Sequence, residues 1–469
     1  MAHTRREIVN DVHSRLNATR VAGIARPRDA DELRAALKGA AELGLAVSVC
    51  GGRHAMGGQQ FGDDTLLIDT TSLTRTLGFD SAAGHVDVEA GAQWPEVIRA
   101  THAVQGDDVR WGIRQKQTGA DAMTLGGAIA ANVHGRGLRM RPFVDDIESL
   151  EVCTAGGEIV ACSRERNAEL FSLVVGGYGL FGVVARVRLR LGPRQKLRRL
   201  VDILDIDDAV PAVQRRVAEG CLYGDFQYAI DPADDSFLRR GVGASYKRVA
   251  PETPISDESS DLKERDWIAL LRLAHTNKGR AFEVYSAHYL ASHGRVYWSD
   301  TMQLSTYIPS YDQFLKDGRE RGAKQPEESL MIGELMVPPE ALVEFLNQAR
   351  AILRATGVED IYGTIRAIQP DDTTFLPWAR RHYACVIFNL RTVHDAAGLA
   401  RTATAFRGLT DAALALGGSF YLTYHRYASP AQVETAYPSF RRFLQLKRQY
   451  DPELRFQSDW YRHYAALFA

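Results

Sequence analysis

The sequence predicts an α+β protein with two domains, and three observations support this prediction. First, 469 residues are too many for one ordinary hydrophobic core. Second, short apolar runs alternate with glycine-rich loops up to about residue 194. Third, strand-like and helix-like segments alternate again from about 330 to 425, which is typical of an antiparallel sheet covered by helices.

The composition is that of an ordinary soluble globular protein. Hydrophobic residues make up 45%, charged residues 25%, and the net charge is −1, so nothing calls for nucleic acid or an anionic membrane as a partner. The five cysteines form no CxxC pair, which argues against a disulfide framework or a metal site and favours a reducing compartment. Because no signal peptide or membrane-spanning run is evident, we expect a cytoplasmic protein.

Hydrophobic periodicity locates the elements of both halves. The first helix should begin at Asp29 or Asp31 and end at Gly44. Further helices are expected at 94–102, 169–175, 339–356 and 395–416. Strands are expected at 45–50, 65–69, 85–90, 183–191, 331–337, 361–367, 383–390 and 419–425, with a hairpin at 147–162 and a polar loop at 251–263.

The loop Gly51–Gly58 follows an apolar strand and contains four glycines in eight residues. Glycine permits positive φ angles and close backbone approach, so successive N–H groups can converge on an anion such as a pyrophosphate. A plain surface turn is the alternative. His54 lies inside this loop, and its position beside an expected pyrophosphate makes it a candidate functional residue.

A second stretch rich in small residues, Thr118–Gly137, would let a flat or extended ligand lie against the backbone. Close packing through small residues is the alternative explanation. The GxGxxG sequence at Gly177–Gly182 follows a helix and precedes a strand, the reverse of the dinucleotide-binding order. It predicts a helix-ending turn that passes close to a ligand.

Several polar residues interrupt or end the apolar strands of the C-terminal half. Any one of them alone is an ordinary outward-facing residue, but together they could line a pocket. They are Glu334, Arg366, Cys385, Tyr424 and His425. Metalloprotease, nucleophile-elbow and Walker motifs are absent from the sequence, which argues against hydrolase and phosphoryl-transfer chemistry.

Four ordered segments resemble the vanillyl-alcohol-oxidase/p-cresol-methylhydroxylase superfamily of FAD enzymes. They are GGRHAMGGQ, TGADAMTLGGAIAANVHG, DIESLEVCTAGGEIV and ELFSLVVGGYGLFGVV, and they cover most of residues 20–195. The C-terminal half is similar to the alditol/aldonolactone oxidase and decaprenylphosphoryl-ribose oxidase branch, through ELMVPPEALVEF, YACVIFNL, GGSFYLTYHR and YDPELRFQSDWYRHY.

This resemblance implies a two-part FAD-binding (PCMH-type) domain, residues 1–194 with a C-terminal segment 426–469 that returns to it, and a substrate domain over 195–425. It implies FAD, bound covalently through His54; from the cysteine pattern and the missing metalloprotease motif, no metal is expected. The implied cofactor-binding residues are Cys50, Gly51, Gly52, Arg53, His54, Ala55, Met56, Gly57, Gly58, Thr118, Gly119, Thr124, Gly126, Gly127, Ala130, Asn132, His134, Gly135, Gly182 and Val183.

The implied catalytic residues are Glu334, Arg366, His134, Tyr424 and His425, and Cys385 matches a pocket cysteine of the ribose oxidases. The lysine that those enzymes carry after the last strand is missing, and Tyr424 or His425 takes its place. We expect oxidation of a hydroxyl on a polar, sugar-like or polyol-like substrate, with dioxygen or another electron acceptor as partner. A flavin-dependent dehydrogenase, desaturase or reductase is the alternative, and a flavin-binding protein without chemistry is a remote third.

Overall fold

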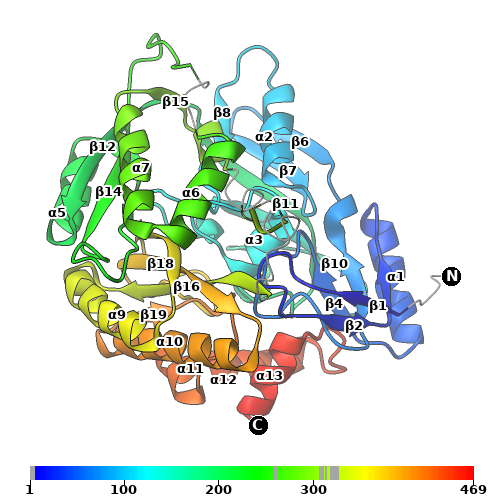
Figure 1. The fold of residues 1–469 in the computed structure, drawn as a ribbon. Coiled ribbons are helices and arrows are strands. Elements are labelled where there is room, and N and C mark those ends of the chain that lie inside the picture. The colour runs from blue at the N-terminus through cyan, green and yellow to red at the C-terminus, as the bar shows by residue number, and fades with distance from the viewer. Residues whose placement is uncertain (1–5, 258–261, 306–310, 312–313, 317–326) are drawn as a thin grey trace.

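The computed structural model describes residues 6–257, 262–305, 311, 314–316 and 327–469. Helices and strands are mixed throughout, so the α+β prediction is confirmed. Two large sheets organise the described chain, one in each half of the sequence (Figure 1). No helix among these residues is long and apolar enough to cross a bilayer.

The N-terminal half contains a small parallel sheet beside a larger antiparallel one. The parallel sheet has the order β3-β5-β4, and helix α1 (Ala30–Glu42) begins at Asp29, whose side chain accepts a hydrogen bond from the Glu32 amide. Leu33, Leu37 and Ala40 of this helix are buried because they recur on one face. The parallel strands are β3 (Gly23–Ala25), β4 (Val47–Cys50) and β5 (Leu66–Asp69), and a separate pair consists of β1 (Glu7–Val9) and β2 (Thr19–Val21).

The larger sheet has the order β10-β9-β11-β7-β6, with β8 paired to the far end of β11. Its central strand β11 (Val183–Pro193) places valines and leucines on the buried face and arginines on the other, as its alternation predicts. The other strands are β6 (Thr76–Asp80), β7 (His85–Glu89), β8 (Trp111–Ile113), β9 (Ile147–Cys153) and β10 (Ile159–Ser163). Helices of this half are α2 (Trp94–Ala103), α3 (Leu125–Ala131) and α4 (Ala168–Val174).

The second half forms an antiparallel sheet in the order β15-β12-β14-β13-β17-β18-β16-β19. Its strands are β12 (Lys196–Asp205), β13 (Cys221–Tyr228), β14 (Arg240–Arg248), β15 (Val296–Trp298), β16 (Glu328–Val337), β17 (Asp360–Ile368), β18 (Tyr383–Val393) and β19 (Ser419–Phe420). Its helices are α5 (Ile206–Ala218), α6 (Glu264–Thr276), α7 (Lys278–Ala291), α9 (Leu342–Thr356) and α10 (Ala396–Ala415). Helix α10 packs on β16 and β18, and α7 packs on β12 and β14 (Figure 1).

Of the C-terminal helices, the first packs on α10, and the two after it lie against the first half of the chain, with Phe443 against Phe181 and Trp460 against Tyr178 (Figure 1). They are α11 (Pro430–Ala436), α12 (Phe440–Tyr450) and α13 (Asp459–Leu467). Between the last two, the amide of Val47 donates to Arg455 and the amide of Gln457 donates to Val47, at 2.6 and 2.8 Å, so the tail extends the parallel sheet beside β4. This contact brings residue 456 next to the strand that leads into the first glycine-rich loop.

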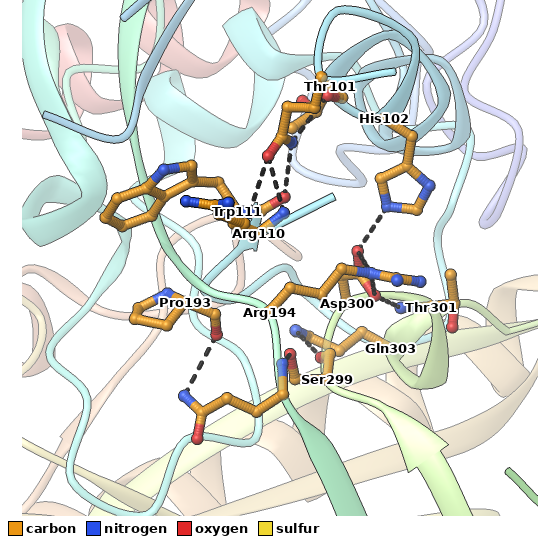
Figure 2. A network of polar contacts seen from close by, with 12 residues as sticks. Thr101, His102, Arg110, Trp111, Pro193, Arg194, Ser299, Asp300, Thr301 and Gln303 are labelled. Atoms are coloured by element: carbon orange, nitrogen blue, oxygen red, sulfur yellow. Dashed lines mark hydrogen bonds and ion pairs between the residues drawn. The ribbon is translucent and has the colours of Figure 1, made fainter. Parts of the chain in front are cut away.

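A buried carboxylate joins the two large sheets at their junction (Figure 2). Asp300 is fully buried and accepts from Nε of Arg194 at 2.9 Å, while its Oδ2 lies 2.6 Å from Nε2 of His102. Three residues further on, the side chain of Gln303 accepts from the amide of Lys116 at 3.1 Å. The turn Thr301–Gln303 therefore fastens the end of β15 to the loop that precedes α3.

Two sequence-based boundaries need correction. The predicted strand 419–425 ends at Phe420, because the chain turns at Leu422 instead of continuing along β16. The helix expected from residue 339 begins at Leu342 after a 3-10 turn at Pro339–Ala341. The predicted polar loop 251–263 lies partly outside the described residues.

Candidate functional site

A cavity of about 890 Å³ lies where elements of the two halves meet. This volume is at the upper end of ordinary ligand pockets. One part of its wall comes from the loop after β4, from α3 and from the turn before β11, and another part comes from β12, β13, β14, β16 and β17. The cavity therefore brings the glycine-rich segments and the polar strand residues into one space.

The first part of the loop Gly51–Gly58 lines the cavity, and the last part does not. A Cβ on Gly51 would lie 2.0 Å from Thr124 Oγ1, and one on Gly52 would lie 2.3 Å from the Ala122 carbonyl oxygen, so neither position has room for a side chain. Arg53 adopts a left-handed φ of 59° and places Nη2 3.2 Å from Asp69 Oδ2. This strained, close-packed backbone is what a ligand cradle requires.

The end of the loop faces the C-terminal segment instead. The amide of Gly57 donates to Thr423 at 3.2 Å, and the carbonyl of Gly58 accepts from Trp460 at 3.4 Å. Neither glycine lines the cavity. Their role in this structure is to fix the loop to the tail.

His54 lines the cavity and contacts a second histidine that the sequence did not single out. Its Nδ1 lies 2.7 Å from Nε2 of His13, which also lines the cavity. Burial lowers the pKa of His54 to about 4, against smaller opposing effects, so its ring is neutral near pH 7. Burial, and then the neighbouring His54, likewise hold the pKa of His13 well below its usual value. No motif marks His13, because 41 residues separate the pair.

The second glycine-rich stretch, Thr118–Gly137, contributes the N-terminus of α3 to the cavity wall. Thr124 caps the helix by accepting from the Gly127 amide at 3.2 Å, and the helix turns its small residues towards the cavity. Asn132 lies behind this surface, where its Nδ2 donates to Asp371 and its Oδ1 accepts from Val144, each at 2.9 Å. Of the twenty residues expected to bind a cofactor, Gly57, Gly58, Asn132 and Gly135 do not line the cavity, and the others do.

The GxGxxG turn between α4 and β11 also reaches the cavity, through Tyr178, Gly179 and Gly182. Tyr178, Gly179 and Gly182 have φ angles of 54°, 76° and 141°, so the turn bends sharply as it passes. Helix α4 precedes it and β11 follows it. The structure thus agrees with a helix-ending turn rather than a dinucleotide-binding motif.

Glu334 is the centre of a buried polar cluster on the cavity wall. Its Oε2 lies 2.6 Å from Nε2 of His134, and its Oε1 accepts from the hydroxyl of Tyr424. Burial alone would raise the pKa of Glu334, but His134, Tyr424 and Arg366 together overcome this and hold it below its ordinary value. Glu334 is therefore ionised near neutral pH, which is unusual for a carboxylate in an apolar strand.

The strand register explains how Arg366 and Cys385 join the cluster. Cys385 pairs with Arg366 on β17 and with Met336 on β16, two residues from Glu334. The Cys385 thiol lies 3.6 Å from Glu334 Oε2 but behind the cavity wall, and burial, followed by the charge of Glu334, raises its pKa well above the usual value. Arg366 lines the cavity and donates to the hydroxyl of Thr118, which links the cluster to the second glycine-rich stretch.

The structure separates Tyr424 from His425, which the sequence could not do. Tyr424 lines the cavity, and burial and the neighbouring Glu334 raise its pKa well above 10, so it donates as a neutral phenol. His425 points away, with its ring centroid 4.1 Å from that of Phe406, and it is not part of the cavity lining. Burial lowers the pKa of His425 to about 3. The turn that replaces the expected end of the strand sends the two side chains to different places.

His134, Glu334 and Cys385 present ligand atoms within 4.8 Å of one another, a grouping that could hold a metal ion. The distances favour a hydrogen-bonded cluster. Two ligands that each lie about 2.0–2.1 Å from a tetrahedral ion are about 3.3 Å apart, whereas His134 and Glu334 are separated by 2.6 Å. The short separation is that of a shared proton.

Comparison with known proteins gives this geometry a class. Residues 21–163 match the family model described as FAD binding domain. Cytokinin dehydrogenase 2 of Oryza sativa subsp. japonica is 34% identical over 186 residues, which are 38% of this chain and 32% of that protein. Cytokinin dehydrogenase 1 of Arabidopsis thaliana is 29% identical over 192 residues, 39% of this chain and 32% of that protein. The match thus spans about a third of the length of these relatives.

A third similar protein, L-gulono-1,4-lactone dehydrogenase of Mycobacterium tuberculosis, is 26% identical over 445 residues, 94% of this chain and 95% of that protein. The chain thus contains an FAD-binding domain. The glycine-lined backbone at the cavity, where Gly51 and Gly52 have no room for a Cβ, fits FAD as the ligand. These matches confirm the resemblance to the vanillyl-alcohol-oxidase/p-cresol-methylhydroxylase superfamily and to its aldonolactone branch.

Proposed function

We propose that this protein is an FAD-dependent oxidoreductase that oxidises the CH–OH group of a polar, sugar-like or polyol-like substrate. One observation carries the proposal: the ionised Glu334, held by His134 and Tyr424, lies on the wall of the cavity that the glycine cradle also lines. A buried, charged carboxylate in a cleft is typical of a functional site. The similarity to a lactone dehydrogenase over nearly the whole chain supports a carbohydrate-like substrate.

In this mechanism the protein positions the substrate and handles its hydroxyl proton. FAD, when bound, supplies the hydride acceptor, its N5 atom. Arg366 donates a hydrogen bond that orients the hydroxyl oxygen, and the hydroxyl of Tyr424 donates to Glu334 and so holds the carboxylate in place. The Glu334–His134 pair accepts the proton as one coupled unit, because the two groups share a hydrogen bond of 2.6 Å. His425 has no part in this step, since it packs against Phe406.

We also propose that FAD is held covalently through His54. Neutral imidazole has a nitrogen lone pair able to bond to a flavin methyl carbon, and the lowered pKa of His54 keeps the ring neutral at pH 7. Acid precipitation of the purified protein tests the link: yellow colour should stay in the pellet for the wild type and move to the supernatant for His54→Ala. Colour in the wild-type supernatant would refute the covalent bond but not the binding of FAD.

The remaining parts of the proposal concern organisation and partners. Residues 1–194 and 426–469 would form the FAD-binding part, and 195–425 the substrate part, as the return of residue 456 to β4 supports. A cytoplasmic location is supported by the cysteines, which are all buried free thiols. The electron acceptor is dioxygen or another oxidant, and the rates of flavin reoxidation by dioxygen and by an artificial quinone distinguish an oxidase from a dehydrogenase.

A second candidate is dehydrogenation of a cytokinin, favoured by the similarity to cytokinin dehydrogenases. Anaerobic stopped-flow spectroscopy separates the candidates. Bleaching of the flavin by alditols or aldonolactones, and not by a cytokinin, is the expected result. Bleaching by the cytokinin alone would overturn the assignment to CH–OH groups, and a bound flavin that no substrate reduces would indicate a flavin-binding protein without chemistry.

A further inference from the structure

One wall of the cavity is formed by β12, β13, β14 and α7, and it contains an arginine that the proposed chemistry does not use. Arg199 on β12 is the cross-strand partner of Tyr246 on β14. Its guanidinium carbon lies 4.1 Å from the centroid of the Tyr289 ring on α7 and 5.6 Å from that of Tyr246. The two rings fix the side chain by cation–π contact, and the group lines the cavity although it is only 8% exposed.

The other arginines of the cavity wall each have an acidic neighbour. Arg53 pairs with Asp69 at 3.2 Å, Arg136 pairs with Asp225 at 3.5 Å, and Arg366 lowers the pKa of Glu334. Within the part of the chain that the structure describes, Arg199 forms no ion pair with a carboxylate, and its Nε is buried without a hydrogen-bond partner. A buried charge is costly unless it is paired, so this guanidinium favours an anion in the cavity.

Nearby acceptor atoms are also unsatisfied. Oδ1 of Asp225 and Oε1 of Gln227, both on β13, are buried without a hydrogen-bond donor and belong to residues that line the same cavity. Acceptors of this kind are matched by hydroxyl groups, which donate. Among the residues that the structure describes, the wall thus offers a guanidinium without an ion pair on β12 and unsatisfied acceptors on β13, the second strand over, a combination that complements a polyhydroxylated anion.

Building on the oxidoreductase function proposed above, we propose that the substrate is an anionic sugar derivative. Arg199 binds its carboxylate or phosphate, Asp225 and Gln227 accept hydrogen bonds from its hydroxyl groups, and the hydroxyl to be oxidised lies at Glu334. Guanidinium is suited to this task because its planar N–H groups match both carboxylate and phosphate oxygens. Sugar acids and sugar phosphates share this chemistry, and the test separates them.

The experiment compares matched substrates on the FAD-loaded protein. Anaerobic flavin reduction is measured with sorbitol, sorbitol 6-phosphate and gluconate, and binding of the same three compounds is measured by thermal shift at low and high salt. Arg199→Met removes the charge but keeps an apolar side chain between the two rings. Arg198→Met is the matched control, because Arg198 is the exposed neighbour on the opposite face of β12.

The expected result is a higher kcat/KM for sorbitol 6-phosphate or gluconate than for sorbitol, and whichever anion is preferred identifies the class. Arg199→Met should lower kcat/KM and weaken binding of that anion about ten- to a hundredfold, the usual weight of a hydrogen bond to a charged group. Arg199→Met should leave kcat/KM for sorbitol unchanged. Arg198→Met should change kcat/KM for neither sorbitol nor the preferred anion. Equal use of neutral and anionic compounds, or an equal loss with all of them in Arg199→Met, would overturn the inference while leaving the oxidoreductase proposal intact. If neither these three compounds nor an aldonolactone reduces the flavin, the result counts against the oxidoreductase proposal itself. In that case the binding measurement still tests the anion site, which is refuted if neither sorbitol 6-phosphate nor gluconate binds.

Discussion

Replacing Glu334 with glutamine tests the proposed chemistry most directly. The amide keeps the size of the side chain and an acceptor for the Tyr424 hydroxyl, but it removes the charge that pairs with His134. General-base assistance contributes roughly 10²–10⁴-fold in typical enzymes, which corresponds to about 2.7–5.4 kcal/mol of activation free energy. Anaerobic stopped-flow measurement of flavin reduction should therefore show a rate lower by this factor, with the FAD content unchanged.

Glu328→Gln is the matched control for this variant. Glu328 lies on the same strand, is 3% exposed and pairs with Arg391 at 2.7 Å, but it does not line the cavity. Both variants remove a buried charge from β16, so a general loss of stability would affect them alike. Reduction at the wild-type rate in Glu334→Gln, or equal slowing in both variants, would refute the assignment of the proton-accepting role.

Three further perturbations test the cradle, the buried histidine and the junction. Gly51→Ala should abolish FAD binding, measured by flavin absorbance, because the new Cβ would lie 2.0 Å from a threonine hydroxyl oxygen. In the control Gly39→Ala the new Cβ meets nothing within 4 Å, so this variant should bind FAD normally. FAD retained by Gly51→Ala would contradict the cradle. His425 stays neutral in the fold, with its pKa lowered to about 3 by burial, while the unfolded chain takes up a proton near pH 6.5. Urea unfolding should therefore show a free energy of unfolding that falls as the pH drops below about 6.5, with this residue contributing up to about 1.4 kcal/mol per pH unit. His425→Phe should make this pH dependence less steep. An unchanged pH dependence in the variant would be inconsistent with a neutral buried ring. Asp300→Asn leaves the buried guanidinium of Arg194 without its carboxylate, so it should lower the free energy of unfolding by about 3–5 kcal/mol and lower the thermal midpoint. The control Asp108→Asn, at an exposed ion pair, should change the midpoint little. Equal midpoints in the two variants would contradict the bridging role of Asp300.

Much of the cofactor half could be predicted because its signals are local. A run of glycines after an apolar strand constrains the backbone by itself, and Gly51 and Gly52 prove to have no room for a Cβ. The reversed order around Gly177–Gly182 was likewise sufficient to discount a dinucleotide-binding motif, and β11 does follow that turn. Periodicity located the helices and strands to within a few residues, except at 419–425, where a turn interrupts an apolar run that reads as a strand.

The sequence by itself determined the α+β class, the glycine cradle with His54, and the presence of polar residues in otherwise apolar strands. Only the tertiary structure decided which of these residues meet. His134 and Glu334 are 200 residues apart, and Tyr424 rather than His425 completes their cluster because a single turn points the two neighbours in different directions. Tertiary structure likewise decided the pairing of His13 with His54 and the position of Arg199, which has no carboxylate partner among the described residues. Contacts between distant strands and loops depend on how the sheets pack. The side-chain pattern of one strand indicates which of its faces is buried, but it does not specify which distant segment will lie opposite that face.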